Sequence, residues 1–98
     1  MNNIIEGNVV VISNKKDYYN INNKVILIAR NTHPDIVIVI NKIKAIITEI
    51  DNKLCHAAII AREFNKPLLM GVNNATKEFK TGDKVVIDFN NKTINKIK

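Results

Sequence analysis

The residue best suited to chemistry in this sequence is His56, which follows an apolar run and a polar turn and opens an expected helix. The N-terminal end of a helix carries unpaired backbone N–H groups and about half a positive charge. This environment favours the neutral, nucleophilic imidazole and also attracts phosphate. Two small neighbours, Ala57 and Ala58, leave room for a bulky phosphoryl donor. On position alone, a capping or surface histidine is the more common interpretation.

Four other side chains near expected helix ends are weaker candidates. Cys55 is either a reactive thiol at a helix start or a small packed neighbour of His56, and we favour the packed neighbour. His33 precedes Pro34 in a helix-start pattern and is interpreted as structural. Arg62 and Glu63 could bind phosphate or a partner, but a salt bridge or a solvated face is the favoured interpretation.

The helix that would position His56 has the strongest pattern in the chain, over Cys55–Phe64. Its apolar residues recur at i, i+3, i+4 and i+7, which places them on one face: Ala57, Ile60, Ala61 and Phe64. Asn65 stands where a left-handed C′ residue ends a helix, and Pro67 follows soon after. Pro34–Asn41 combines a helix-start signal with strand-like composition, and we interpret it as a short helix.

Apolar, β-branched runs between polar turns predict strands elsewhere. The expected strands are Val9–Ser13, Lys24–Arg30, Ala45–Thr48, Leu68–Met70, Val85–Phe89 and Thr93–Ile97, the last two forming a hairpin. Asn14–Asn23 is expected to be a loop or bulged connection, and Thr81–Asp83 a turn with positive φ at Gly82. Gly71 is expected to permit close backbone packing. The pattern predicts a mixed α/β fold with a small mixed sheet and one main helix at about 55–65.

Composition limits the function classes. The chain has 98 residues, which predicts a single domain over 1–98. A net charge of +6 would suit a nucleic-acid binder, but the lysines are spread along the chain and stacking aromatics are few, so no nucleic-acid partner is expected. A single cysteine excludes an internal disulfide, and no apolar run is long enough to span a membrane. We therefore expect a cytoplasmic protein with no membrane association.

The segment around His56 resembles the active-site signature of the phosphoenolpyruvate-utilising enzymes, most closely that of phosphoenolpyruvate synthase and pyruvate phosphate dikinase. The resemblance covers nearly the whole chain in order, through residues 32–35, 45–48, 55–63, 67–72, 74–76 and 81–88. It implies a phosphohistidine swivelling domain with a β/β/α fold. His56 would be the phosphorylated nucleophile, with phosphate contacts from Ala57, Ala58 and Lys53.

The sequence departs from the family pattern in the turn before His56. Asp51 and Asn52 stand where the family usually has a glycine pair, and Leu54 stands where it usually has threonine. Both Asp and Asn tolerate the left-handed region, so the turn itself is expected to form. The Asp51 charge would oppose a nearby phosphate, and Leu54 offers no hydroxyl to bind it.

The resemblance also implies what this domain needs from other proteins. His56 would take a phosphoryl group from phosphoenolpyruvate or a nucleotide-derived donor and carry it to a second active site. An ATP-grasp subunit and a phosphoenolpyruvate/pyruvate barrel subunit, expected on separate chains, would supply these sites together with Mg²⁺. No metal or other cofactor is expected on this domain, and it should not turn over alone. The alternative is a degenerate swivelling module with a structural or regulatory role.

Overall fold

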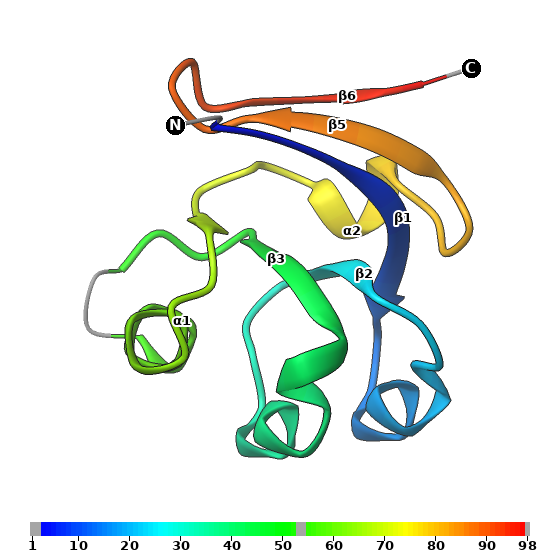
Figure 1. Ribbon diagram of the computed structural model, residues 1–98, viewed down its shortest axis with the longest axis vertical. Helices are drawn as coiled ribbons and strands as arrows, with labels where there is room; N and C mark the ends of the chain where they lie inside the picture. The colour runs from blue at the N-terminus through cyan, green and yellow to red at the C-terminus, as the bar shows by residue number, and fades with distance from the viewer. Residues whose placement is uncertain (1–2, 53–54, 98) are drawn as a thin grey trace.

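A computed structural model of the chain, which describes residues 3–52 and 55–97, has a mixed six-stranded sheet of order β4-β3-β2-β1-β5-β6 (Figure 1). The strands are β1 Ile4–Ile12, β2 Val25–Ala29, β3 Ile43–Thr48, β4 Leu68–Leu69, β5 Lys84–Asp88 and β6 Thr93–Lys96. The helices are the 3-10 helices η1 Lys15–Asn20 and η2 Pro34–Lys42, and the α-helices α1 His56–Glu63 and α2 Ala75–Glu78. Strands β1 to β4 pair in parallel, whereas β5 runs antiparallel to β1 and β6 antiparallel to β5. The predicted mixed α/β sheet and terminal hairpin are confirmed.

The central strand β2 is buried along its whole length and separates two apolar clusters. Leu27 faces the cluster that η1, η2 and α1 cover, and its neighbour Ile28 faces the cluster with Phe79 and Ile87. This alternation follows from the two-residue period of a strand. Figure 1 shows the helical segments η1, η2 and α1 together on one side of β2 and β3, while α2 and the curled continuation of the sheet, β5 and β6, lie on the other. Because both faces are covered, β2 reads as a continuous apolar run.

Local capping explains why η2 is helical despite its β-branched residues. His33 is the N-cap, and its Nδ1 accepts a hydrogen bond of 3.1 Å from the Asp35 backbone N–H. Pro34 fixes the first turn, as the sequence indicates. Ile36, Val39 and Ile40 are buried in the core, whereas Ile38 is 66% exposed. Burial of one face therefore outweighs the strand propensity, and the predicted helix is confirmed as a 3-10 helix.

Three expectations about element bounds were wrong. β1 begins at Ile4 rather than Val9, because its first half pairs with β5. The expected loop after β1 contains η1, which begins with a capping box between Asn14 and Asp17. The segment that contains α2 was not assigned to any helix.

The end of α1 follows the prediction closely. Asn65 has φ 54°, the left-handed conformation expected at C′. The backbone N–H of Lys66 then donates to the Ala61 carbonyl at 2.8 Å, which completes a Schellman motif. This turn fixes the direction in which the chain leaves α1 and enters β4.

Candidate functional site

His56 is the first residue of α1, and its side chain is half-exposed. The N-cap residue Cys55 makes no side-chain capping hydrogen bond, and the Cys55 carbonyl accepts from the Ile59 N–H at 3.2 Å. The backbone N–H groups of His56, Ala57 and Ala58 precede the first such bond, so they have no acceptor within the helix. A half-exposed imidazole at the N-terminal end of a helix is the placement that the sequence predicts.

One hydrogen bond fixes the orientation of the imidazole ring. The Thr32 Oγ1 lies 2.8 Å from His56 Nδ1, and Thr32 itself is only 9% exposed. With Nδ1 held, Nε2 is the ring nitrogen available for a reaction. When Nδ1–H donates to the threonine oxygen, Nε2 keeps its lone pair and is the nucleophile.

Parallel pairing of β2 and β3 brings Thr32 and His56 together. Thr32 follows β2, and His56 follows β3 after a longer loop, so both lie beyond the carboxyl edge of adjacent strands. The two connections run beside each other, because the N–H groups of Glu49 and Ile50 donate to the carbonyls of Ala29 and Arg30 at 3.2 and 3.1 Å. The fully buried Thr48 tightens the second connection by donating its hydroxyl to the Ile50 carbonyl at 2.8 Å.

A hollow of about 300 Å³ has Thr32 in its wall and therefore lies beside His56. Its lining includes the cations Lys15 and Arg30. The Tyr18 phenol also lines it, and burial is the main cause that raises the pKa of Tyr18, opposed by the hydrogen bond from the His33 backbone N–H. The hollow thus presents positive charge and a neutral phenol in the same lining as Thr32.

A contact between Glu49 and Thr76 anchors the loop that leads to His56. Glu49 accepts hydrogen bonds from the Thr76 hydroxyl at 2.6 Å and from the Thr76 backbone N–H at 2.9 Å. These two donors hold the pKa of the Glu49 carboxyl below its usual range, and the positive charges of Arg30 and Lys77 act in the same direction. The carboxylate therefore sits at the start of α2, where the helix dipole favours a negative charge.

The weaker candidates take the structural places that were favoured for them. Cys55 is half-buried, with its Sγ 4.0 Å from Met70 Sδ, which fits a packed neighbour of His56. His33 caps η2 and packs against Tyr18. Arg62 and Glu63 are exposed, and within the described part of the chain neither takes part in an ion pair. Of the two favoured alternatives for that pair, the solvated face agrees with the structure.

The turn before His56 is only partly described, because Lys53 and Leu54 lie outside the described residues. The Asp51 side chain lies against Gly71: a Cβ on this glycine would stand 3.1 Å from Asp51 Oδ2. Gly71 also has φ 76°, so a side chain there would be disfavoured both by the backbone conformation and by the contact with Asp51. The predicted close packing at Gly71 is therefore a contact with Asp51.

The role of Thr32 was not predicted from the sequence, where this residue stands only within the 32–35 segment of the family resemblance. A usable signal was present. Thr32 and His56 each follow an apolar strand, and adjacent parallel strands direct their carboxyl ends to the same edge of a sheet. Lys15 and Arg30, which line the hollow together with Thr32, were also not identified from the sequence.

Within residues 3–52 and 55–97, no cluster of three or more His, Cys, Asp or Glu side chains is arranged to hold a metal ion. Among the same residues, no helix is both long enough and apolar enough to cross a membrane.

A family model, curated relatives and a solved structure all resemble this chain over most of its length. A family model described as PEP-utilising enzyme, mobile domain, matches residues 21–92. A probable phosphoenolpyruvate synthase of Pyrococcus horikoshii is 38% identical over 82 residues, covering 84% of this chain and 10% of the relative. A rifampicin phosphotransferase of Bacillus cereus is 37% identical over 82 residues, covering 84% and 9%. A solution structure of an Enzyme I protein superposes with a TM-score of 0.61 at 26% identity, over 76% of this chain and 31% of that one. The chain thus spans about a tenth of the length of these curated relatives.

Proposed function

This chain belongs to the family of mobile domains of phosphoenolpyruvate-utilising enzymes, and on that basis we propose that it is a phosphocarrier whose His56 accepts a phosphoryl group on Nε2 and passes it on. The observation that carries the proposal is the 2.8 Å contact between Thr32 Oγ1 and His56 Nδ1. It holds the ring in one orientation at a half-exposed position and leaves Nε2 free.

The proposed step is an in-line displacement at phosphorus. The Nε2 lone pair forms the N–P bond while the P–O bond to the donor breaks, and the electron pair of that bond leaves with the donor oxygen. The Nδ1 proton remains in its hydrogen bond to Thr32 Oγ1, where the oxygen stabilises the positive charge that develops on the ring. The first-turn N–H groups of α1, including those of Ala57 and Ala58, stabilise the phosphoryl oxygens.

We further propose that the donor and acceptor sites belong to an ATP-grasp domain and a phosphoenolpyruvate/pyruvate barrel on separate subunits. The curated relatives are about eight to nine times as long as this chain, which leaves ample length for such sites outside the matched region. These partner sites would also supply Mg²⁺.

The test is phosphoryl transfer from a defined donor enzyme. Radiolabelled phosphoenolpyruvate is incubated with this chain and a phosphoenolpyruvate synthase from which the mobile domain has been deleted. A parallel reaction uses labelled ATP. We expect label on this chain that is acid-labile and alkali-stable, as a phosphoramidate is, and that is absent in His56→Ala.

A mobile domain from a competent relative serves as the positive control, and it must be labelled in both reactions. Asp51→Gly combined with Asn52→Gly restores the usual glycine pair, and faster labelling would show that these side chains obstruct the donor. If the control is labelled while the wild type and the glycine variant are not, the chain is a degenerate module and the carrier proposal is wrong.

A further inference from the structure

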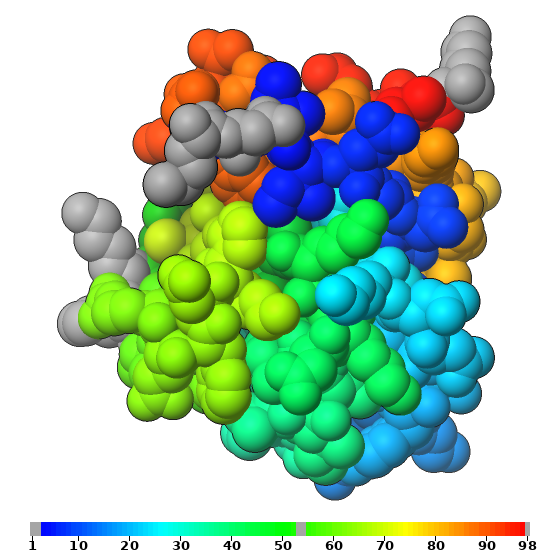
Figure 2. Space-filling view, in the orientation of Figure 1, coloured from blue at the N-terminus to red at the C-terminus, as the bar shows by residue number. Residues whose placement is uncertain are grey.

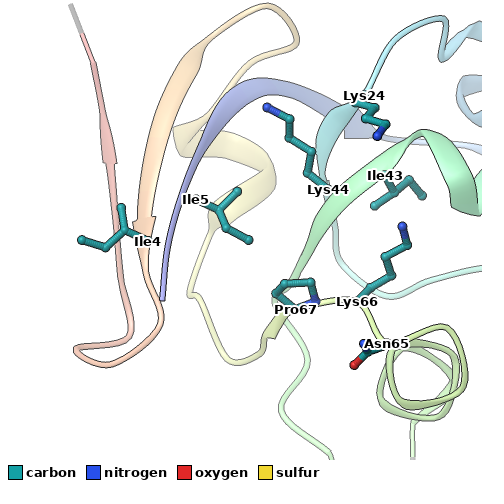
Figure 3. A pocket seen from close by; sticks show the side chains of 8 residues that line it. All are labelled: Ile4, Ile5, Lys24, Ile43, Lys44, Asn65, Lys66 and Pro67. Atoms are coloured by element: carbon teal, nitrogen blue, oxygen red, sulfur yellow. The ribbon is translucent and has the colours of Figure 1, made fainter. Parts of the chain in front are cut away.

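A second hollow lies at the opposite edge of the sheet from His56. It has a volume of about 430 Å³ and combines apolar walls with three lysines. Its lining residues are Ile4, Ile5, Lys24, Ile43, Lys44, Asn65, Lys66 and Pro67 (Figure 3). We call it the lysine hollow. In Figure 2 the blue start of β1, the cyan segment before β2, the green start of β3 and the yellow-green segment after α1 meet on this face.

The topology explains why three lysines from distant parts of the chain gather there. Lys24 directly precedes β2, Lys44 is the second residue of β3, and Lys66 precedes β4. Parallel pairing of these strands aligns their amino ends along one edge. His56 lies beyond the carboxyl end of β3, which has six residues. At about 3.3 Å per residue, the strand separates the two sites by roughly 20 Å.

Local features place two of the three lysines, Lys44 and Lys66. Lys44 donates to the Glu6 carbonyl at 3.0 Å and lies across β1 at Gly7, where a Cβ would stand 3.3 Å from its Cδ. The backbone N–H of Lys66 closes the Schellman motif at the end of α1. In Figure 3 the ammonium group of Lys44 points away from that of Lys66, so the positive charges are spread along the hollow rather than directed at one point.

The charges of these lysines are not neutralised within the domain. Within the described residues, none of the three lies in an ion pair with a carboxylate, and no acidic residue lines the hollow. Ile4 is 49% exposed and adds an apolar surface beside them. Spread cations beside exposed aliphatic groups complement an extended chain that alternates negative and apolar side chains, rather than a single compact anion.

We propose that the lysine hollow docks an acidic segment of a protein partner, with carboxylates on Lys24, Lys44 and Lys66 and aliphatic side chains on Ile4 and Pro67. Such a contact leaves the opposite edge of the sheet, with His56, free to enter an active site. The interaction requires neither phosphorylation nor His56 itself. It is therefore independent of the phosphocarrier proposal.

The probe is a fluorescein-labelled peptide of alternating aspartate and leucine, and the measurement is its anisotropy as this chain is added at low salt. Exchanging Lys24, Lys44 and Lys66 together for Gln should raise the Kd at least about tenfold. The matched control exchanges three exposed lysines outside the hollow, Lys16, Lys77 and Lys80, for Gln and removes the same charge. It should change the Kd less than about twofold.

Three further arms make the result specific. His56→Ala should bind the peptide as the wild type does. Ile4→Thr should weaken binding of the leucine peptide but not of one with serine in place of leucine. Amide shifts of the wild type on titration should be largest near Asn65 and Lys66, which reports the site even if a triple variant unfolds. The proposal is wrong if the peptide does not bind, if both lysine triples weaken it equally, or if duplex DNA competes as well as unlabelled peptide.

Discussion

At the level of single residues, the reactivity of His56 depends on which of its two ring nitrogens is held in a hydrogen bond. A free imidazole exchanges between two tautomers and has two nucleophilic positions. In this structure Thr32, itself buried, contacts Nδ1 at 2.8 Å. The contact fixes the ring orientation, and Nε2 carries the lone pair when Nδ1–H is the donor to the threonine oxygen. Orienting the ring is the role that outer hydrogen-bond partners of functional histidines commonly have.

Thr32→Val should therefore slow phosphorylation of His56 by about tenfold to a hundredfold, because the valine keeps the shape of the side chain but offers no oxygen to Nδ1. Thr32→Ser should recover most of the rate. The readout is the initial rate of labelling by the donor enzyme, together with the ¹⁵N shifts of the imidazole, which report the tautomer.

If Thr32 had only a structural role, the variants would give different results. In that case Thr32→Val would lower the melting temperature while the labelling rate per folded molecule stayed unchanged, and the imidazole shifts would match those of the wild type. That outcome would remove Thr32 from the mechanism.

The sequence was sufficient to find the nucleophile candidate but not its partner. His56 carries local signals, namely the turn before it and the apolar period after it. Thr32 lies 24 residues earlier, and its contact with His56 exists only because β2 and β3 pair in parallel. A local pattern contains no information about such a pairing.

At the scale of elements, α2 illustrates how a distant residue stabilises a short helix. Four residues form too short a helix to be stable alone. Glu49, 27 residues before Thr76, accepts two hydrogen bonds at the first turn of α2. The helix was missed because its cap comes from another loop. By contrast, η1 begins with a capping box that the sequence displays, at Asn14 and Asp17.

Stability should depend on the charge of Glu49. The folded state holds the pKa of this carboxyl below its ordinary value of 4.5, so the ionised group stabilises the fold above that value. The stabilisation is lost as pH falls through the lower, folded pKa. Glu49→Gln should lower the free energy of unfolding by about 1 kcal/mol near neutral pH, a figure reduced for solvent screening.

Urea unfolding at a series of pH values measures this effect. The difference between Glu49→Gln and wild type should shrink as the pH is lowered through the region below 4.5. Glu78→Gln, on the exposed surface of the same helix, is the control and should change stability little. A difference that stays constant down to strongly acidic pH would contradict the assignment.

The exposed face of α1 is expected to contact the donor enzyme. Ile59 is 44% exposed and lies one turn after His56, on the same side of the helix. Ile59→Ser should raise the KM for the donor enzyme by about tenfold, because an apolar contact beside the nucleophile is lost. Phosphorylation of His56 by free phosphoramidate, which needs no protein contact, should be unchanged.

The matched control for that surface is Ile38→Ser. Ile38 is 66% exposed but lies on η2. It should leave the KM unchanged. Equal effects of both substitutions would indicate a general loss of solubility or stability rather than a docking contact at α1.

At the scale of the whole molecule, parallel strands separate two kinds of surface. The carboxyl edge of β2 and β3 holds Thr32 and His56, and the amino edge holds the lysine hollow. The mixed sheet and its terminal hairpin were predictable from apolar runs and turns. The strand order was not, because a run such as Ile4–Ile12 shows no sign of which strands it will pair with.

If this domain is a phosphocarrier, Nε2 of His56 is the atom that accepts the phosphoryl group. The most direct measurement is ³¹P–¹⁵N correlation NMR of the ¹⁵N-labelled chain after reaction with the donor enzyme and phosphoenolpyruvate or ATP. We expect one phosphoramidate, bonded to Nε2 of His56, with Nδ1 still protonated toward Thr32. Phosphorus on Nδ1, on another residue, or nowhere in a chain whose positive control is labelled would contradict it.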